Sequence, residues 1–166
     1  MAKERNATIK YIFETHFHAD FVSGHIDLSK ATGAPIIYGP EAKPTFKVTI
    51  AKDKEVFPLG KASFEVLHTP GHTLESTCYL LKDEDGKPNA LFTGDTLFIG
   101  DVGRPDLAQG SSLYTTTDLA GILYDSIQEK IMSLPDDVIV YPAHGAGSSC
   151  GKNLSSETQS TIKEQK

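Results

Sequence analysis

The stretch FETHFHADFVSGH, residues 13–25, carries three histidines and an aspartate within thirteen residues and continues the apolar run IKYIF. Further metal-capable side chains follow in HTPGH (68–72), TGD (93–95) and PAH (142–144). Mixed imidazole and carboxylate groups are ligands for transition metals, whereas calcium prefers oxygen donors alone. An ordered set of this kind would arise by chance only rarely, so it predicts a metal centre.

The rest of the chain must supply elements that position these groups. Short β-rich runs alternate with helix-like segments and turn signals, which indicates an α/β fold. We expect strands at 8–13, 34–39 and 137–145, hairpins at 54–68 and 76–95, and helices at 22–33 and 117–134. Gly33 should close the first helix, and the hairpins should turn at Gly60 and at Asp85-Gly86.

Most of the metal-capable residues lie just beyond predicted strands, namely five of the six histidines and two aspartates. Ligands converge at strand ends in α/β sheets, so these residues should gather at one edge. A lone histidine is more often a structural residue than a ligand, and His68 is interpreted in that way. His25 falls in the predicted helix beyond the loop, and there a structural and a metal-binding role are equally favoured.

The composition limits the classes of partner. The chain has 166 residues, with 16 Lys+Arg against 22 Asp+Glu and a net charge of -6, and it contains no basic cluster. One domain without nucleic-acid or membrane partners is expected. A signal-like apolar region is also lacking, which predicts a cytoplasmic protein. Cys78 and Cys150 lack CxxC spacing and predict no disulfide, and Cys78, within a predicted strand, should belong to the core.

The histidine and aspartate motifs carry a family resemblance. From about residue 9 to 153 the chain resembles the metallo-β-lactamase superfamily, whose members share an αββα sandwich. The resemblance rests on the ordered set HFHAD (16–20), PGH (70–72), GD (94–95) and PAH (142–144). Within that superfamily, ETHFHADFVSGH, HTPGHTLEST, FTGDTLFIGDVGRPDLAQ and YPAHGAGSSCGK most resemble the persulfide dioxygenases. Those enzymes use iron(II) and O2 to convert a thiol persulfide into sulfite and free thiol, and some carry appended rhodanese domains.

The resemblance implies a role for each motif residue. His16, His72 and Asp95 would be the ligands of one Fe(II) per chain, a two-histidine, one-carboxylate group that leaves one face of the ion open for substrate sulfur and oxygen. His18, Asp20 and His144 would not bind this ion but would hold the ligand side chains in their orientation. In the related glyoxalase II type thioesterases the same three would bind a second metal ion directly. Zinc would accept the same donors as iron.

One position separates the two branches. In the hydrolases the aspartate of the first motif is followed by a histidine that ligates the second metal, whereas here Asp20 is followed by Phe21. A phenyl ring cannot bind a metal ion. The loss of this nitrogen donor weakens the second site and favours the one-metal dioxygenase.

Four further residues are candidates for the site. Arg104 should contact an anionic substrate group or a carboxylate outside the ligand set, because guanidinium forms paired hydrogen bonds with carboxylates, and Asp106 could be that partner. The alternative for Arg104 is an ordinary surface ion pair. Cys150, six residues after His144 in a glycine-rich loop, could carry a persulfide, although a buried cysteine is more often a small apolar residue. Thr93 could orient a ligand.

Both ends of the chain are short compared with the dioxygenases that it resembles. Those enzymes normally begin with two or more strands and a helix before the first motif, and they continue beyond CGK (150–152). We therefore expect a metallo-β-lactamase-like domain over 1–153 that is incomplete at its N-terminus, followed by a polar tail over 154–166. An open sheet without its partner strands favours instability, aggregation or completion by a second chain.

Three functions remain open on the sequence. The leading one is an iron(II)-dependent persulfide dioxygenase acting on a small-molecule thiol persulfide and O2. The second is a zinc-dependent thioesterase resembling hydroxyacylglutathione hydrolases, in which a metal-bound hydroxide attacks the acyl carbonyl. The third is a non-catalytic metal-binding fragment that needs a partner chain. The sequence leaves open the carrier thiol, a homodimer and a rhodanese partner acting in trans.

Overall fold

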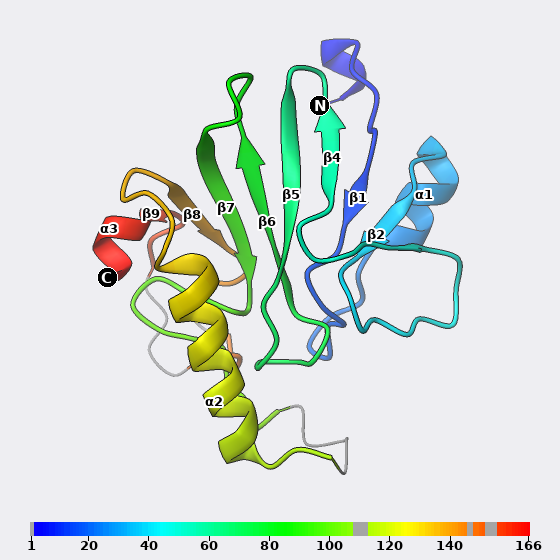
Figure 1. The fold of residues 1–166 in the computed structure, drawn as a ribbon. Helices are drawn as coiled ribbons and strands as arrows, with labels where there is room; N and C mark the ends of the chain where they lie inside the picture. Colours follow the sequence, from blue (N-terminus) through cyan, green and yellow to red (C-terminus); the bar gives the residue numbers. More distant parts are fainter. Residues whose placement is uncertain (1, 108–112, 146–147, 152–155) are drawn as a thin grey trace.

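Two β-sheets form the centre of the molecule. The computed structural model describes residues 2–107, 113–145, 148–151 and 156–166 (Figure 1). The smaller sheet is parallel, in the order β1 (Ile12–Phe13), β2 (Ile36–Tyr38), β3 (Thr49–Ile50). The larger sheet follows the chain in the order β4 (Val56–Leu59), β5 (Ala62–His68), β6 (Thr77–Lys82), β7 (Pro88–Gly94), β8 (Ile139–Pro142), β9 (Ser160–Thr161). The predicted α/β class is confirmed.

Both predicted hairpins are present in the larger sheet. Strands β4 and β5 pair antiparallel around Gly60, and β6 pairs antiparallel with β7. The second turn is held by the Asp83 carboxylate, whose Oδ1 accepts from the backbone N–H groups of Asp85 and Lys87. Gly86 adopts a left-handed φ of 76°, which glycine reaches without strain.

The helices begin and end close to their predicted bounds. Helix α1 (His25–Thr32) ends at Gly33 in the left-handed conformation. Helix α2 (Thr116–Ser126) starts with a capping box between Thr115 and Asp118 and continues as a π-helical turn over Ile127–Ile131. Short helices cover Lys3–Arg5 and α3 (Ile162–Gln165).

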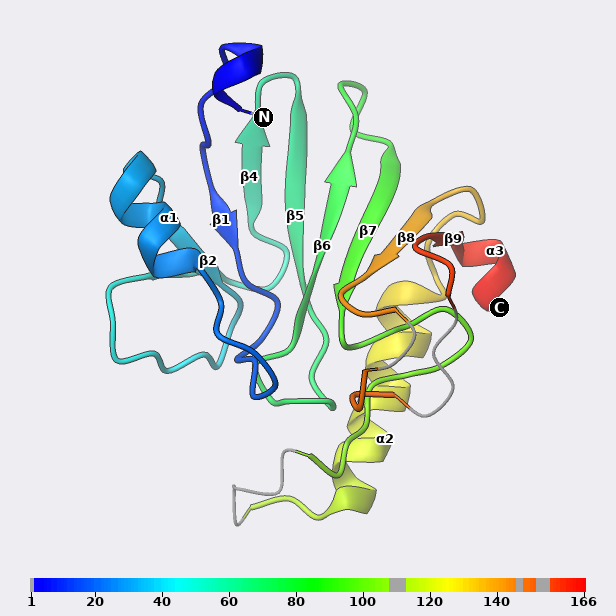
Figure 2. The ribbon, with the colours of Figure 1, turned by 180° about the vertical axis from the view of Figure 1, so that it is seen from behind.

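The main core lies between α2 and one face of the larger sheet. Figures 1 and 2 show from opposite views that the C-terminal end of α2 lies beside β7 and β8, while its N-terminal end extends beyond the sheet. The buried apolar residues of this core are Leu67, Cys78, Leu80, Leu91, Leu97, Leu123, Ile127, Ile131, Val138, Val140 and Ile162. Cys78 is therefore a core residue, as predicted, and its burial raises the pKa of the thiol to about 11.

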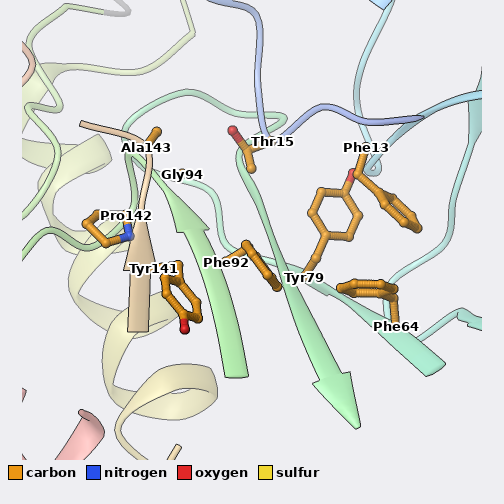
Figure 3. A pocket seen from close by; sticks show the side chains of 9 residues that line it. All are labelled: Phe13, Thr15, Phe64, Tyr79, Phe92, Gly94, Tyr141, Pro142 and Ala143. Carbon is orange, nitrogen blue, oxygen red and sulfur yellow. The ribbon is translucent and has the colours of Figure 1, made fainter. Parts of the chain in front are cut away.

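The other face of the larger sheet is only partly covered. The smaller sheet packs over β4–β6, where Ile37 and Phe13 meet Val66 and Tyr79. Beyond this contact, β7 and β8 line an apolar hollow of about 440 Å³, in which Phe92 remains 38% exposed and stacks on Tyr141. Figure 3 shows the aromatic side chains that line this hollow.

The end of the chain differs from the predicted polar tail. Strand β9 pairs antiparallel with β8, so the strand predicted at 137–145 is not the last one. Ile162 is fully buried in the main core, although the surrounding segment is polar. The pairing of β9 with β8, the buried side chain of Ile162 and the ion pair between Lys166 and Asp136 dock residues 160–166 on the sheet, whereas residues 152–155 lie outside the described part of the chain. Among the described residues, no helix is both long enough and apolar enough to span a membrane.

Truncation of Ile162 to alanine should destabilise the protein by about 2–4 kcal/mol, because it leaves a cavity in a closed core. Urea unfolding at equilibrium measures the change in the free energy of unfolding. The matched control is Lys163→Ala at the next, exposed position, which should change stability by less than about 0.5 kcal/mol. Equal stabilities of the two variants would show that the last segment does not belong to the core.

Candidate metal centre

The predicted convergence of the motifs is confirmed. His16 follows β1, His72 follows β5, Asp95 follows β7 directly, and His144 follows β8. Strands β7 and β8 are parallel, and β5 shares their direction because both β5 and β7 are antiparallel to β6. Their carboxyl ends therefore meet at one edge of the sheet. The backbone N–H of Thr77 donates to the carbonyl of Thr15, which brings the loop after β1 to the same edge.

Three donors form a buried group at this edge. Asp95 Oδ2 lies 3.7 Å from His16 Nε2 and 3.6 Å from His72 Nε2. The three residues are between 1% and 4% exposed. Neither carboxylate oxygen of Asp95 has a hydrogen-bond partner among the described residues. A buried and unpaired carboxylate is costly, and a bound cation would remove that cost, so the donor set fits a metal ion.

The two histidines present metal-binding nitrogens to Asp95. His72 Nδ1 donates to the Arg104 carbonyl at 2.9 Å, which leaves the lone pair on Nε2. His16 Nδ1 lies 3.0 Å from Thr15 Oγ1. Burial, together with the neighbouring His18, His72 and His144, lowers the pKa of His16 from its ordinary 6.5 to about 3. His16 is therefore neutral near pH 7, as a metal ligand must be.

A second group of donors adjoins the first. His144 Nε2 lies 3.4 Å from Asp95 Oδ2 and 3.4 Å from Asp20 Oδ2. The Cys150 thiol donates to Asp20 Oδ2 at 3.9 Å. Cys150 is 6% exposed, and its burial and the carboxylates of Asp95 and Asp20 raise the pKa of the thiol. The structure thus brings Cys150 to the centre, in its protonated form.

Sequence reasoning missed Glu14, a buried carboxylate that organises the first motif. Its oxygens lie 3.5 Å from His18 Nε2 and 3.3 Å from His25 Nδ1, and Ser23 Oγ donates to it at 2.9 Å. Burial raises the pKa of Glu14, but the hydrogen bonds from His18 and Ser23 and the histidine charges outweigh it, so the pKa is lowered overall. The available signal was an acidic residue directly after the apolar strand.

Three histidines lie outside the two donor groups. His25 starts α1 and stacks on Phe46, with ring centroids 5.1 Å apart. His68 donates from Nε2 to the Leu74 carbonyl at 2.8 Å, which agrees with its predicted structural role. His18 faces Glu14, and its Nδ1 is buried with no hydrogen-bond partner in the described part of the chain.

Arg104 contributes to the centre through its backbone. Its carbonyl fixes His72, and its N–H donates to the Cys150 carbonyl. The guanidinium makes the predicted paired hydrogen bonds with Asp106, at 3.0 and 2.6 Å, and a further bond of 3.3 Å to the Ser149 carbonyl. Asp106 raises the pKa of Arg104 further. The side chain therefore ties the 104–106 segment to the loop that carries Cys150.

Close backbone packing holds the ligands. A Cβ on Gly103 would lie 1.8 Å from the Asp95 carbonyl oxygen and 3.1 Å from His72 Cβ, so only glycine fits between these two ligands. Gly71, with φ of 138°, packs against the backbone of Leu123 in α2 in the same way. Thr93 Oγ1 donates to the Leu97 carbonyl at 2.7 Å and so fixes the turn that carries Asp95, rather than a ligand side chain directly.

A cavity of about 340 Å³ opens beside the donors. It is lined by His16, Phe17, Ala19, Asp20, His72, Thr73, Leu107, Ser149 and Cys150. Members of both donor groups thus face one space of a size suited to a small molecule.

A family model described as "Metallo-beta-lactamase superfamily" matches residues 2–144, which include both donor groups except Cys150. The chain belongs to the metallo-beta-lactamase superfamily. The αββα class predicted from the motifs is confirmed by similar solved structures.

Two such structures cover nearly the whole chain. A metallo-beta-lactamase from Staphylococcus aureus has a TM-score of 0.84 and 36% identity, covering 99% of this chain and 48% of that one. ETHE1 from Myxococcus xanthus has a TM-score of 0.77 and 31% identity, and the match covers 98% of this chain and 62% of that one.

The curated relatives in the superfamily include hydrolases. A hydroxyacylglutathione hydrolase of Brucella anthropi is 38% identical over 145 residues, which are 86% of this chain and 50% of that protein. A probable hydroxyacylglutathione hydrolase of Schizosaccharomyces pombe is 34% identical over 142 residues, which are 85% of this chain and 50% of that protein. The chain spans about half the length of these curated relatives.

Replacing Gly103 by alanine should weaken metal binding at least about tenfold, because the new methyl group displaces Asp95 or His72. Competition with a chromophoric chelator measures the dissociation constant for Zn²⁺. The control is Gly24→Ala, where no atom lies within 4 Å of the added Cβ. Unchanged affinity in a folded Gly103→Ala protein would contradict the tight packing of the two ligands.

The metal-free protein should lose stability as the pH falls from 6.5 towards 3. Within this range the unfolded chain holds a proton on His16 that the folded chain excludes, so the free energy of unfolding decreases with decreasing pH. The contribution of one such group is up to about 1.4 kcal/mol per pH unit. Denaturant titrations over this range should show a shallower dependence in His16→Asn. Parallel curves for the two proteins would show that His16 titrates normally in the folded state.

Proposed function

We propose that the protein is an iron(II)-dependent dioxygenase that oxidises a small thiol persulfide with O2 to sulfite and free thiol. The observation that carries the proposal is the buried group of His16, His72 and Asp95, which offers two imidazoles and one carboxylate. This donor set is typical of mononuclear non-haem iron oxygenases. Zinc accepts the same donors, so the identity of the metal as iron(II) is itself part of the proposal.

His16 and His72 would hold the ion through Nε2, and Asp95 through its carboxylate. A bound iron(II) ion would supply the electron chemistry that allows O2 to oxidise sulfur. The chain fixes the two rings: the Arg104 carbonyl selects the tautomer of His72, and Thr15 anchors His16. The 340 Å³ cavity would receive the persulfide next to His16 and His72.

Phe21 supports a centre with one catalytic ion. Its ring lies over His18, with centroids 4.3 Å apart, and 6.5 Å from the ring of His144. Phe21 therefore occupies the position at which the two-metal hydrolases have a histidine that binds the second metal ion.

Arg104, Asp106 and Cys150 have different parts in the proposal. The Arg104–Asp106 pair would shape the cavity by tying two loops together, because the guanidinium already bonds Asp106 and Ser149. Cys150 lines the cavity, but burial and the neighbouring carboxylates raise the pKa of its thiol, so it would contact the substrate rather than attack it.

The second candidate is a thioesterase of the hydroxyacylglutathione hydrolase type. It is favoured by the names of curated relatives at 34% and 38% identity, and by Asp20 and His144 lying next to Asp95. Two zinc ions and hydrolysis of an acylglutathione without oxygen consumption would identify it.

The anaerobically purified, Fe(II)-loaded protein should take up O2 when glutathione persulfide is added and release about one sulfite per O2. His72→Ala should reduce the rate by at least about 100-fold, because one of three ligands is lost. An oxygen electrode, with sulfite and metal content assayed on the same sample, makes the measurement.

His68→Gln is the matched control, since glutamine keeps an N–H donor for Leu74 outside the centre. It should retain the activity. A folded, iron-loaded protein that consumes no oxygen would overturn the dioxygenase, and zinc-dependent acylglutathione hydrolysis by that protein would establish the second candidate.

A further inference from the structure

The loop that joins β5 to β6 carries His72 and rests on α2 and on the π-helical turn that follows it. The last paired residues of these two strands are His68 and Thr77, so the backbone of His72 lies outside the ladder. Helical residues hold the loop instead, and the hydroxyl of Ser126 donates to the Pro70 carbonyl at 2.8 Å. The position of the ligand therefore depends on a helix that comes much later in the chain.

Lys130, in the π-helical turn, holds the end of β5 from two sides. Its ammonium group donates to the His68 carbonyl at 2.6 Å and to Asp53 Oδ2 at 2.9 Å. Asp53 Oδ1 in turn accepts the backbone N–H of His68 at 2.7 Å. One ion pair thus fixes both backbone polar groups of His68, at the residue where the strand becomes the ligand loop. Turns of the π type are rare and are frequently found at functional sites.

The geometry of this ion pair matters more than its contribution to stability. The side chains of Lys130 and Asp53 are 26% and 36% exposed, and partly exposed pairs contribute little to folding. The ammonium group nevertheless directs its hydrogen bonds to the segment that leads into the metal centre. A shift of the backbone at His68 would move His72 Nε2 relative to Asp95 Oδ2, from which it lies 3.6 Å. Ligand sets tolerate only small displacements of this kind.

We propose that Lys130 is a positioning residue of the metal centre, which acts through the backbone that carries His72. Asp53 orients the ammonium group of Lys130, and Ser126 holds the next part of the same loop. The inference rests on His72 being a metal ligand, as the proposed function requires. Loss of the ammonium group should therefore weaken metal binding more than it weakens the fold.

Titration of the metal-free protein with Co²⁺ tests the inference without persulfide or O2. Lys130→Met keeps the length of the side chain and removes its charge. This variant should bind Co²⁺ about tenfold more weakly and show shifted visible absorption bands, because His72 is displaced in the ligand set. Lys130→Arg keeps a cation that can donate to both oxygen atoms, so it should restore the affinity and the spectrum. Urea unfolding of the metal-free proteins measures the stability of the fold separately.

Lys82→Met is the matched control. Lys82 is 27% exposed and pairs with Glu65, and it lies opposite Ser63, at the other end of the β5–β6 pair from His68. It should lower the urea midpoint about as much as Lys130→Met does and leave Co²⁺ binding unchanged. Equal Co²⁺ affinities and spectra of the two variants would overturn the inference.

Two further results keep the inference testable. If Lys130→Met does not fold, Asp53→Asn takes its place and should also weaken Co²⁺ binding, whereas unchanged binding in that variant counts against the inference. Wild-type protein that binds no Co²⁺ would remove the metal centre and the inference together. The dioxygenase is measured by oxygen uptake, so it can fail while the Co²⁺ titrations still support Lys130 as a positioning residue.

Discussion

The buried carboxylate of Asp95 is the constraint on which the rest of the centre depends. It is 1% exposed and has no hydrogen-bond partner among the described residues, yet it lies within 3.7 Å of nitrogen atoms from three histidines. Such an arrangement is unfavourable for the protein alone and favourable around a cation. The loops after β1, β5, β7 and β8 therefore surround a position that suits a positive charge, which a bound cation would supply.

The sheet converts this constraint into geometry. The parallel pairing of β7 and β8 brings Asp95 and His144 to one edge, and the hydrogen bond from Thr77 to Thr15 brings the first motif to it. Backbone groups then set the details, since the Arg104 carbonyl selects the tautomer of His72 and Gly103 allows Asp95 and His72 to approach. Positions without reactive side chains thus determine how the reactive ones are presented.

The sequence predicted the parts of the structure whose signals are local and strong. The ligand group follows from residue types that are rare together, and the hairpins follow from alternation around Gly60 and Gly86. Strands β3 and β9 are two residues long, too short for alternation to be recognised.

Some site features could not be predicted for other physical reasons. Glu14 was missed because a single acidic residue after a strand normally faces solvent, and its burial depends on His18, His25 and Ser23 gathering around it. The role of the Arg104 carbonyl has no sequence signal at all, since every residue has a carbonyl.

The contact between Gly71 and Leu123 has a consequence for cooperativity. The loop that carries His72 rests directly on the backbone of α2, the helix that closes the main core. Movement of that loop cannot occur without disturbing the helix, so the ligand and the core open together. Metal occupancy should therefore be transmitted to the whole domain as slower amide hydrogen exchange in α2, far beyond the atoms that touch the ion.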